Sequence, residues 1–326
     1  MNTRAIDLVN IGLMIISCVA AFVVPFELFL FSYAVMGPLH YLTEINWLHK
    51  RNYFTSGKME AEWLVLLCVL LGVFTFMYTG YTNAGSLMIF LAFASALAFV
   101  AFENSTWKFL FVALAAVFGV LLMKAPAFFI LFSVFLPTLI HTFVFTALFM
   151  LHGTLKNKSV TGIASLLVFV VCSLTFFVFY PQFGFYQVSD YAQRSLTDSG
   201  FVQLNKAIIN LFNLGATARE NIFASDIGLG IMRFIAFGYT YHYLNWFSKT
   251  RVIQWHKVPK KMLVMVVVFW VISMALYAWD YKTGLSVLYL LAMLHAFMEF
   301  PLNYRSIIGI WDELGALTGM RKPASR

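Results

Sequence analysis

Two histidines each precede a glutamate by four residues inside apolar stretches of the chain. His40 and Glu44 stand in the run 37–44, and His295 and Glu299 repeat the spacing near the other end. Residues four apart lie on the same face of a helix. Ionisable side chains are costly to bury in a membrane-spanning helix, so by default they mark a functional site. These two pairs are therefore the first candidates for chemistry.

Two further histidines, His141 and His242, also stand in apolar stretches. Neutral imidazole is the commonest side-chain ligand of iron, copper and zinc. Metal centres in helical bundles are built from side chains on facing helices. Four such helices therefore predict one metal site with His40, His141, His242 and His295 as ligands. A bound divalent ion would also offset the cost of burying carboxylates beside it.

The glutamates Glu44 and Glu299 fit two roles at such a site. Each could bind the metal directly through a carboxylate oxygen. Each could instead accept a hydrogen bond from the ring N–H of a ligating histidine, which fixes the tautomer and raises the basicity of the ring. We favour the second role, and we expect both residues to act in catalysis by orienting ligands or relaying protons.

The composition is that of a membrane protein. Of the 326 residues, 61% are hydrophobic and 11% are charged, and the mean hydropathy is +0.82. The formal net charge of +8 is no sign of nucleic-acid binding, because excess Lys and Arg in a membrane protein determine its topology. Cys18, Cys68 and Cys172 lie in apolar runs without disulfide or metal-motif spacing. We expect them to be reduced packing residues.

Apolar runs of about twenty residues, each long enough to cross a bilayer, recur along the chain. We expect an all-α, polytopic bundle of about ten transmembrane helices, and residues 1–326 form a single integral membrane domain. The predicted spans are 6–24, 27–48, 62–80, 85–103, 107–123, 127–152, 160–180, 227–248, 262–280 and 284–304.

The orientation follows from the basic residues. Lys and Arg are concentrated after the even-numbered spans, in 49–58, 153–158, 249–261 and 305–326. Such segments stay in the cytoplasm, so both termini are predicted to be cytoplasmic. At about 1.5 Å per residue, the four histidines then lie within a layer of roughly 12 Å in the cytoplasmic half of the bilayer.

The polar stretch 181–226 is predicted to be an external loop. Its segment 202–212 has apolar residues at helical spacing, so it could form an amphipathic helix on the outer surface. The other three histidines, His49, His152 and His256, stand near basic segments or span ends. Interfacial positions explain them more simply than metal binding does.

Four short segments resemble the Brp/Blh-type membrane β-carotene dioxygenases, which are bacterial and archaeal integral membrane proteins of similar length. The segments are Gly37-Pro38-Leu39-His40 with Glu44, Ile140-His141-Thr142-Phe143, Tyr241-His242-Tyr243, and Leu294-His295 with Glu299. The resemblance covers the order and context of these segments and not the loops between them. It implies a four-histidine iron centre and oxidative cleavage of a carotenoid to retinal. In this chain Leu39 stands where that family has proline, and its acids are glutamates rather than aspartates.

The sequence thus predicts a membrane-embedded non-haem iron oxygenase that uses Fe(II) and O2 on a lipophilic substrate from the surrounding lipid bilayer. We expect it in the bacterial inner (cytoplasmic) membrane, without nucleic acid as a partner, and leave any electron donor open. Two alternatives use the same residues. In a dimetal membrane hydroxylase, Glu44 and Glu299 would be ligands. In a proton or metal-ion transporter, the histidines and glutamates would form a pathway.

Overall fold

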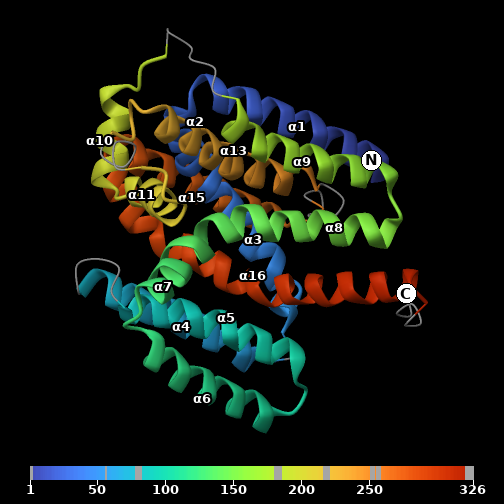
Figure 1. Ribbon diagram of the computed structural model, residues 1–326. Helices are drawn as coiled ribbons and strands as arrows, with labels where there is room; N and C mark the ends of the chain where they lie inside the picture. The colour runs from blue at the N-terminus through green and yellow to red at the C-terminus, as the bar shows by residue number, and fades with distance from the viewer. Residues whose placement is uncertain are drawn as a thin grey trace. The chain divides into compact units, whose positions relative to one another are not determined.

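The computed structural model describes residues 3–55, 57–77, 83–179, 186–215, 221–249, 254 and 258–319. Every regular element among these residues is a helix (Figure 1), which confirms the all-α expectation. Eight described helical stretches are long and apolar enough to cross a membrane, as expected of an integral membrane protein. They are α1 (Thr3–Val23), α4 (Lys58–Met77), α5 (Asn83–Ala101), α6 (Ser105–Leu122), the continuous stretch Pro126–Asn157, α9 (Val160–Val178), α15 (Lys260–Trp279) and α16 (Tyr281–Leu317).

The other two predicted spans are also helical, but they do not have the features of a simple apolar span. The first is divided into three short elements, α2 (Pro25–Phe31), η1 (Ser32–Met36) and α3 (Gly37–His49). The second, α13 (Asp226–Ser248), is long enough but carries many polar side chains. The count of ten and the cytoplasmic termini stay predictions. Residues 320–326, 250–253 and 255–257, on which the orientation partly depends, lie outside the described residues.

The chain divides into two compact units. The first unit comprises residues 1–40 and 157–288, and α13 is its central helix. This helix packs against α1, α2, α9 and η1, and Figure 1 shows α1, α9 and α13 running alongside one another. A helix that is buried on most of its faces belongs in a core, which explains how α13 can hold polar side chains away from lipid.

The first unit also contains two short helices within the stretch 181–226. They are α10 (Asp190–Asp198) and α11 (Val202–Leu211). The helix α11 occupies the segment in which the apolar spacing predicted one, and it buries Leu204 and Ile208 on one side. Its position on the outer surface of a membrane stays a prediction, as does the single-domain organisation.

The second unit comprises residues 41–156 and 289–326. Its helix α5 packs against α4, α6, α7 (Pro126–Phe129) and η3 (Ile130–Phe145). The chain continues from η3 into α8 (Thr146–Asn157). Lys108 of α6 forms an ion pair of 2.6 Å with Glu60 of α4. The cysteines Cys18, Cys68 and Cys172 are free and buried, as predicted.

The π-helical turn η1 ends at Met36, one helical turn before His40. Proline has no N–H, so Pro38 cannot donate to the carbonyl four residues earlier, and η1 replaces the ordinary α-helical bonding there. Side chains satisfy two carbonyls nearby: Trp270 Nε1 donates to Val35 O at 2.7 Å, and Tyr281 Oη donates to Leu30 O at 3.2 Å. Such π-helical turns often occur at functional sites. The turn sets the direction in which α3 presents His40.

Candidate metal centre

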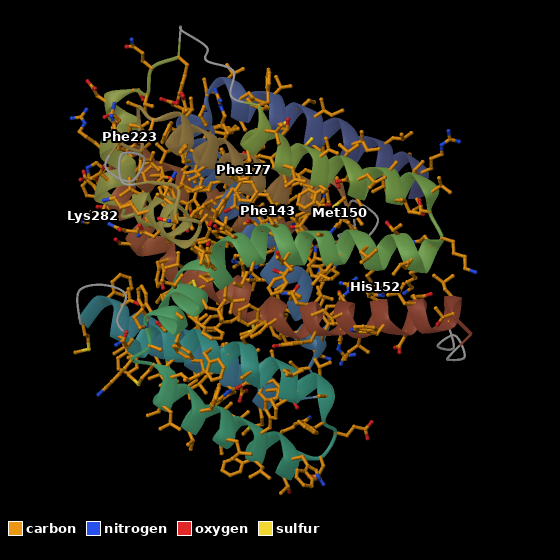
Figure 2. All side chains as sticks on the ribbon, viewed as in Figure 1. Phe143, Met150, His152, Phe177, Phe223 and Lys282 are labelled. Atoms are coloured by element: carbon orange, nitrogen blue, oxygen red, sulfur yellow. The ribbon has the colours of Figure 1, made fainter. Side chains whose placement is uncertain are left out.

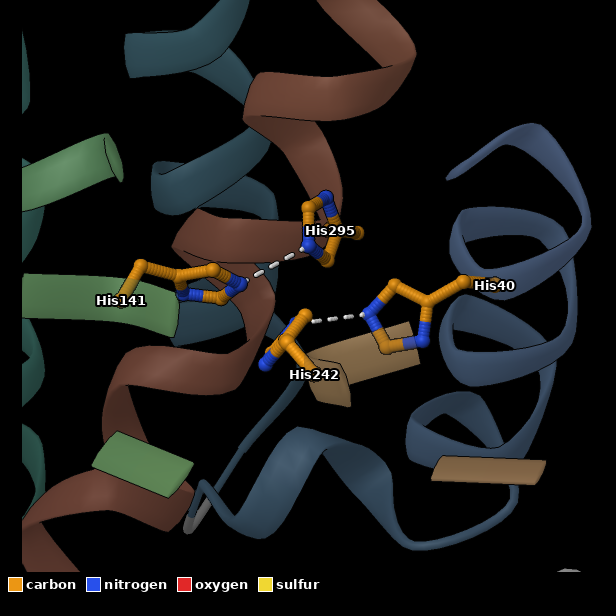
Figure 3. Close-up of side chains that lie close together, drawn as sticks. All are labelled: His40, His141, His242 and His295. Atoms are coloured by element: carbon orange, nitrogen blue, oxygen red, sulfur yellow. Dashed lines mark hydrogen bonds between the residues drawn. The ribbon is translucent and has the colours of Figure 1, made fainter. Parts of the chain in front are cut away.

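In the first unit, His40 and His242 face each other through their Nε2 atoms. His40 lies in the first turn of α3 and His242 near the end of α13, and the two nitrogens are 3.2 Å apart (Figure 3). Both side chains are buried. The rings of Tyr243 and Trp246 pack against His40, with centroids at 5.1 and 5.7 Å. Aromatic neighbours on α13 therefore hold this pair in a largely apolar environment.

In the second unit, His141 and His295 form an equivalent pair. Their Nε2 atoms are 3.1 Å apart (Figure 3), and both side chains are buried. His141 lies in the π-helical segment η3, four residues after Pro137, and His295 lies on α16. Tyr41 stacks on the His295 ring, with centroids 4.3 Å apart and planes 23° apart. The stacking fixes the plane of the His295 imidazole.

The nitrogen separations within both pairs have the size expected of adjacent ligands on one ion. Two nitrogens at about 2.05 Å from a metal, which is a typical Zn–N(His) bond length, are roughly 3.1–3.2 Å apart when they subtend about 100°. The same separations also suit a single hydrogen bond between two imidazoles. Each pair therefore has ligand-like spacing before any ion is bound.

Both glutamates lie beside the second pair. Ligand-type atoms of Glu44, His295 and Glu299 lie within 4.8 Å of one another, and all three residues are buried. Glu299 Oε2 also lies 3.6 Å from Nδ1 of His141. The two nitrogens of the His141 ring therefore face different partners, with Nε2 toward another histidine and Nδ1 toward a carboxylate. That is the arrangement expected when a carboxylate orients a ligating histidine.

The four buried histidines, His40 and His242 in the first unit and His141 and His295 in the second, are residues that could ligate a metal ion. The donor set decides which ions would suit it. Imidazole nitrogens favour iron, copper, zinc or nickel, whereas Mg²⁺ and Ca²⁺ prefer oxygen ligands. The residues present thus fit the predicted transition-metal centre, and the identity of the metal stays a prediction.

The remaining histidines do not join these groups within the described part of the chain. His49 is exposed and hydrogen-bonds with Tyr53 Oη at 3.1 Å. His152 is partly exposed on α8, on the side toward α16 (Figure 2), where its ring lies against Gly309. His256 lies outside the described residues.

Two site residues were absent from the sequence prediction. Tyr41 is the direct neighbour of His40 in the chain, yet it packs on His295. Asn303 stands four residues after Glu299, which itself stands four residues after His295, and Asn303 is 1% exposed. Extending that spacing by one more turn would have identified Asn303 as a buried polar residue of the same face.

The first unit contains an apolar cavity of about 260 Å³. Side chains from α2, η1 and α15 line it, among them Leu30, Ala34 and Met274. Its one acidic residue is Glu27, which accepts hydrogen bonds from Tyr186 Oη at 2.8 Å and from the backbone N–H of Ser189 at 3.0 Å. The cavity is smaller than the usual 300–1,000 Å³ of a ligand site, so it suits a ring or a short apolar segment.

Comparisons with protein-family models, with curated proteins and with solved structures find no match to this chain.

Proposed function

We propose that the protein is a membrane-embedded non-haem iron oxygenase acting on a lipophilic substrate, and that both histidine pairs bind one Fe(II). The observation that carries the proposal is the spacing within the pairs. The Nε2 atoms lie 3.2 Å apart in the first pair and 3.1 Å apart in the second. The second pair is also buried beside Glu44 and Glu299. This supports the proposal, because a divalent ion compensates the charge of buried carboxylates.

The chain itself supports a shared centre. His40 and Glu44 lie one turn apart on the continuous helix α3, and residues so spaced share a helix face. Glu44 in turn groups with His295 and Glu299. One helix therefore carries a histidine of the first pair and a carboxylate that belongs with the second.

Each residue has a distinct role in this proposal. When bound, Fe(II) supplies the activation of O2. The four imidazoles bind the metal as neutral ligands. Once the metal is bound, Glu299, which lies 3.6 Å from Nδ1 of His141, would accept the N–H at that nitrogen, so that Nε2 binds the ion. Glu44, which groups with His295, would orient His295 in the same way. The aromatic rings of Tyr41 and Trp246 fix the imidazole planes and exclude water.

A lipophilic substrate suits the surroundings of the site. The apolar cavity at Leu30, Ala34 and Met274 lies on the helical stretch that leads into His40. Apolar side chains are also exposed along α6 and α15, as on helices that face lipid. A carotenoid and a bacterial inner membrane follow from the resemblance to the Brp/Blh-type dioxygenases and stand as part of the proposal. An electron donor is left open.

A dimetal hydroxylase is the second candidate function. It is favoured by the group of Glu44, His295 and Glu299, whose ligand-type atoms lie within 4.8 Å of one another. In that case the carboxylates bind a second ion instead of orienting histidines. The number of metal ions per chain separates the two functions.

Metal analysis of purified protein tests the proposal. We expect a single iron per chain, and we expect both His242→Ala and His295→Ala to lose it, because each pair supplies ligands to the same ion. His49→Ala, at an exposed histidine, is the matched control and retains iron. Two irons per chain would select the dimetal enzyme. Full iron retention in both alanine variants, or no iron in freshly prepared wild type after anaerobic reconstitution, would overturn the proposal.

A further inference from the structure

Helix α16 carries a line of buried polar side chains beyond the metal centre. His295, Glu299 and Asn303 follow one another at intervals of four and are 4%, 1% and 1% exposed. Ser306 is also buried, at 2%. With 3.6 residues per turn, these four positions fall within about 80° of the helix circumference. The polar side chains therefore form one stripe on a helix that is otherwise largely apolar.

Asn303 is the unusual member of this stripe. Neither its Oδ1 nor its Nδ2 has a hydrogen-bond partner among the described residues. Burying an amide without partners is unfavourable, because the group loses its hydrogen bonds with water. Buried polar groups are in general satisfied, by water where the protein offers nothing. We therefore expect a water molecule or a hydrated ion to hydrogen-bond with the Asn303 amide or be bound by it.

The stripe leads to a partly exposed histidine at its far end. Gly309 has the His152 ring directly against it, and a Cβ at this position would collide with His152 Nε2. Two charged residues interact electrostatically with His152: Lys156 on α8 and Glu313, one further turn along α16. From His295 to Gly309 the helix rises about 21 Å. An imidazole and a carboxylate thus stand at the end of the stripe, where a divalent cation from solution would first meet ligands.

We infer that this stripe is the path by which a divalent metal ion, accompanied by water, reaches the histidine centre. The inference rests on the proposed function, since it requires that the centre binds metal. The Glu313 carboxylate attracts the ion and His152 binds it. Asn303 Oδ1 replaces part of its water shell halfway, and Glu299 delivers it to His141 and His295. Oxygen and imidazole ligands at intervals of about one turn, near 6 Å, keep the ion from crossing an unligated apolar stretch.

The rate of metal loading tests this path. Apo-protein in detergent is mixed with Co²⁺ alone, and binding is followed through the visible absorption of the protein-bound ion. Asn303→Leu keeps the approximate size of the side chain and removes its polar atoms. We expect loading to slow by about tenfold, the effect of one lost ligand-like contact on a barrier, while the final Co²⁺ content is unchanged. Asn205→Leu, a buried asparagine on α11, is the matched control and loads at the wild-type rate.

A second variant keeps the test decisive if Asn303→Leu folds poorly. His152 is partly exposed, so His152→Ala is tolerated, and we expect it to slow loading at low Co²⁺ without reducing the final content. A wild-type loading rate in both variants overturns the path and leaves the metal centre standing. A reduced final content at a normal rate overturns it as well, because Asn303 would then be part of the centre. Wild-type protein that binds no Co²⁺ overturns the centre and the path together.

Discussion

Glu299 and His141 meet at 3.6 Å although they are far apart in the chain, with the carboxylate Oε2 on the side of Nδ1. The other nitrogen of the ring, Nε2, faces His295. A carboxylate on the Nδ1 side favours the tautomer of His141 with its proton at Nδ1, which leaves a lone pair at Nε2. Glu299 can therefore orient His141 without itself binding the metal, and the two roles can be tested separately.

We predict that Glu299→Gln weakens metal binding by about 10- to 100-fold, the usual cost of disturbing a residue that orients a ligand. The amide keeps the shape and one acceptor atom but loses the charge. The measurement is a metal titration of apo-protein. Glu27→Gln, in the first unit, is the control and leaves the affinity unchanged. Complete loss of metal at saturating concentrations would mean that Glu299 is itself a ligand.

Tyr41 stacks on His295 with only 23° between the ring planes. We expect Tyr41→Phe to retain both stability and metal, because the stacking surface is preserved. Tyr41→Ala should destabilise the fold by about 3–5 kcal/mol, as other buried aromatic truncations do, and should lower iron content. Thermal unfolding and metal analysis of the two variants measure these effects. Equal behaviour of the phenylalanine and alanine variants would show that stacking has no role.

Trp270 supplies the hydrogen bond to Val35 O at the π-helical turn before His40. We predict that Trp270→Phe costs about 1–3 kcal/mol of stability, because the carbonyl loses its donor within an apolar region. The midpoint of thermal unfolding in detergent measures the loss. Trp279→Phe is the matched control, since Trp279 is 80% exposed. A shift of equal size in both variants would indicate that the hydrogen bond to Val35 contributes nothing.

The basic segments predict the topology of the chain. A reporter enzyme fused after Arg326 should be active only in the cytoplasm, whereas one inserted between α10 and α11 should be active only outside. The physical reason is retention of Lys- and Arg-rich segments on the cytoplasmic side. An external C-terminal reporter would reverse the orientation and remove the argument that the histidines share the cytoplasmic half of the membrane.

The helix faces of the histidines and the membrane helices follow from the sequence, because each depends only on residues close together in the chain. The spacing of four places His40 with Glu44 and His295 with Glu299 on single helix faces, whatever the helices pack against. Apolar runs of bilayer length indicate membrane helices for the same reason. All four histidines and both glutamates are buried in the structure, as expected of ionisable residues at a functional site within membrane-spanning helices.

Other features depend on contacts between residues far apart in the chain. The pairing of His40 with His242, and of His141 with His295 and Glu299, is decided by which helices pack together. Packing free energy sums over many side chains, and no short spacing encodes it. The π-helical turn at η1 likewise needs Trp270, a residue from a remote helix, to satisfy its carbonyl. The Asn303 amide, which has no hydrogen-bond partner among the residues that the structure describes, could be recognised only in three dimensions, because burial depends on the neighbours as much as on the residue itself.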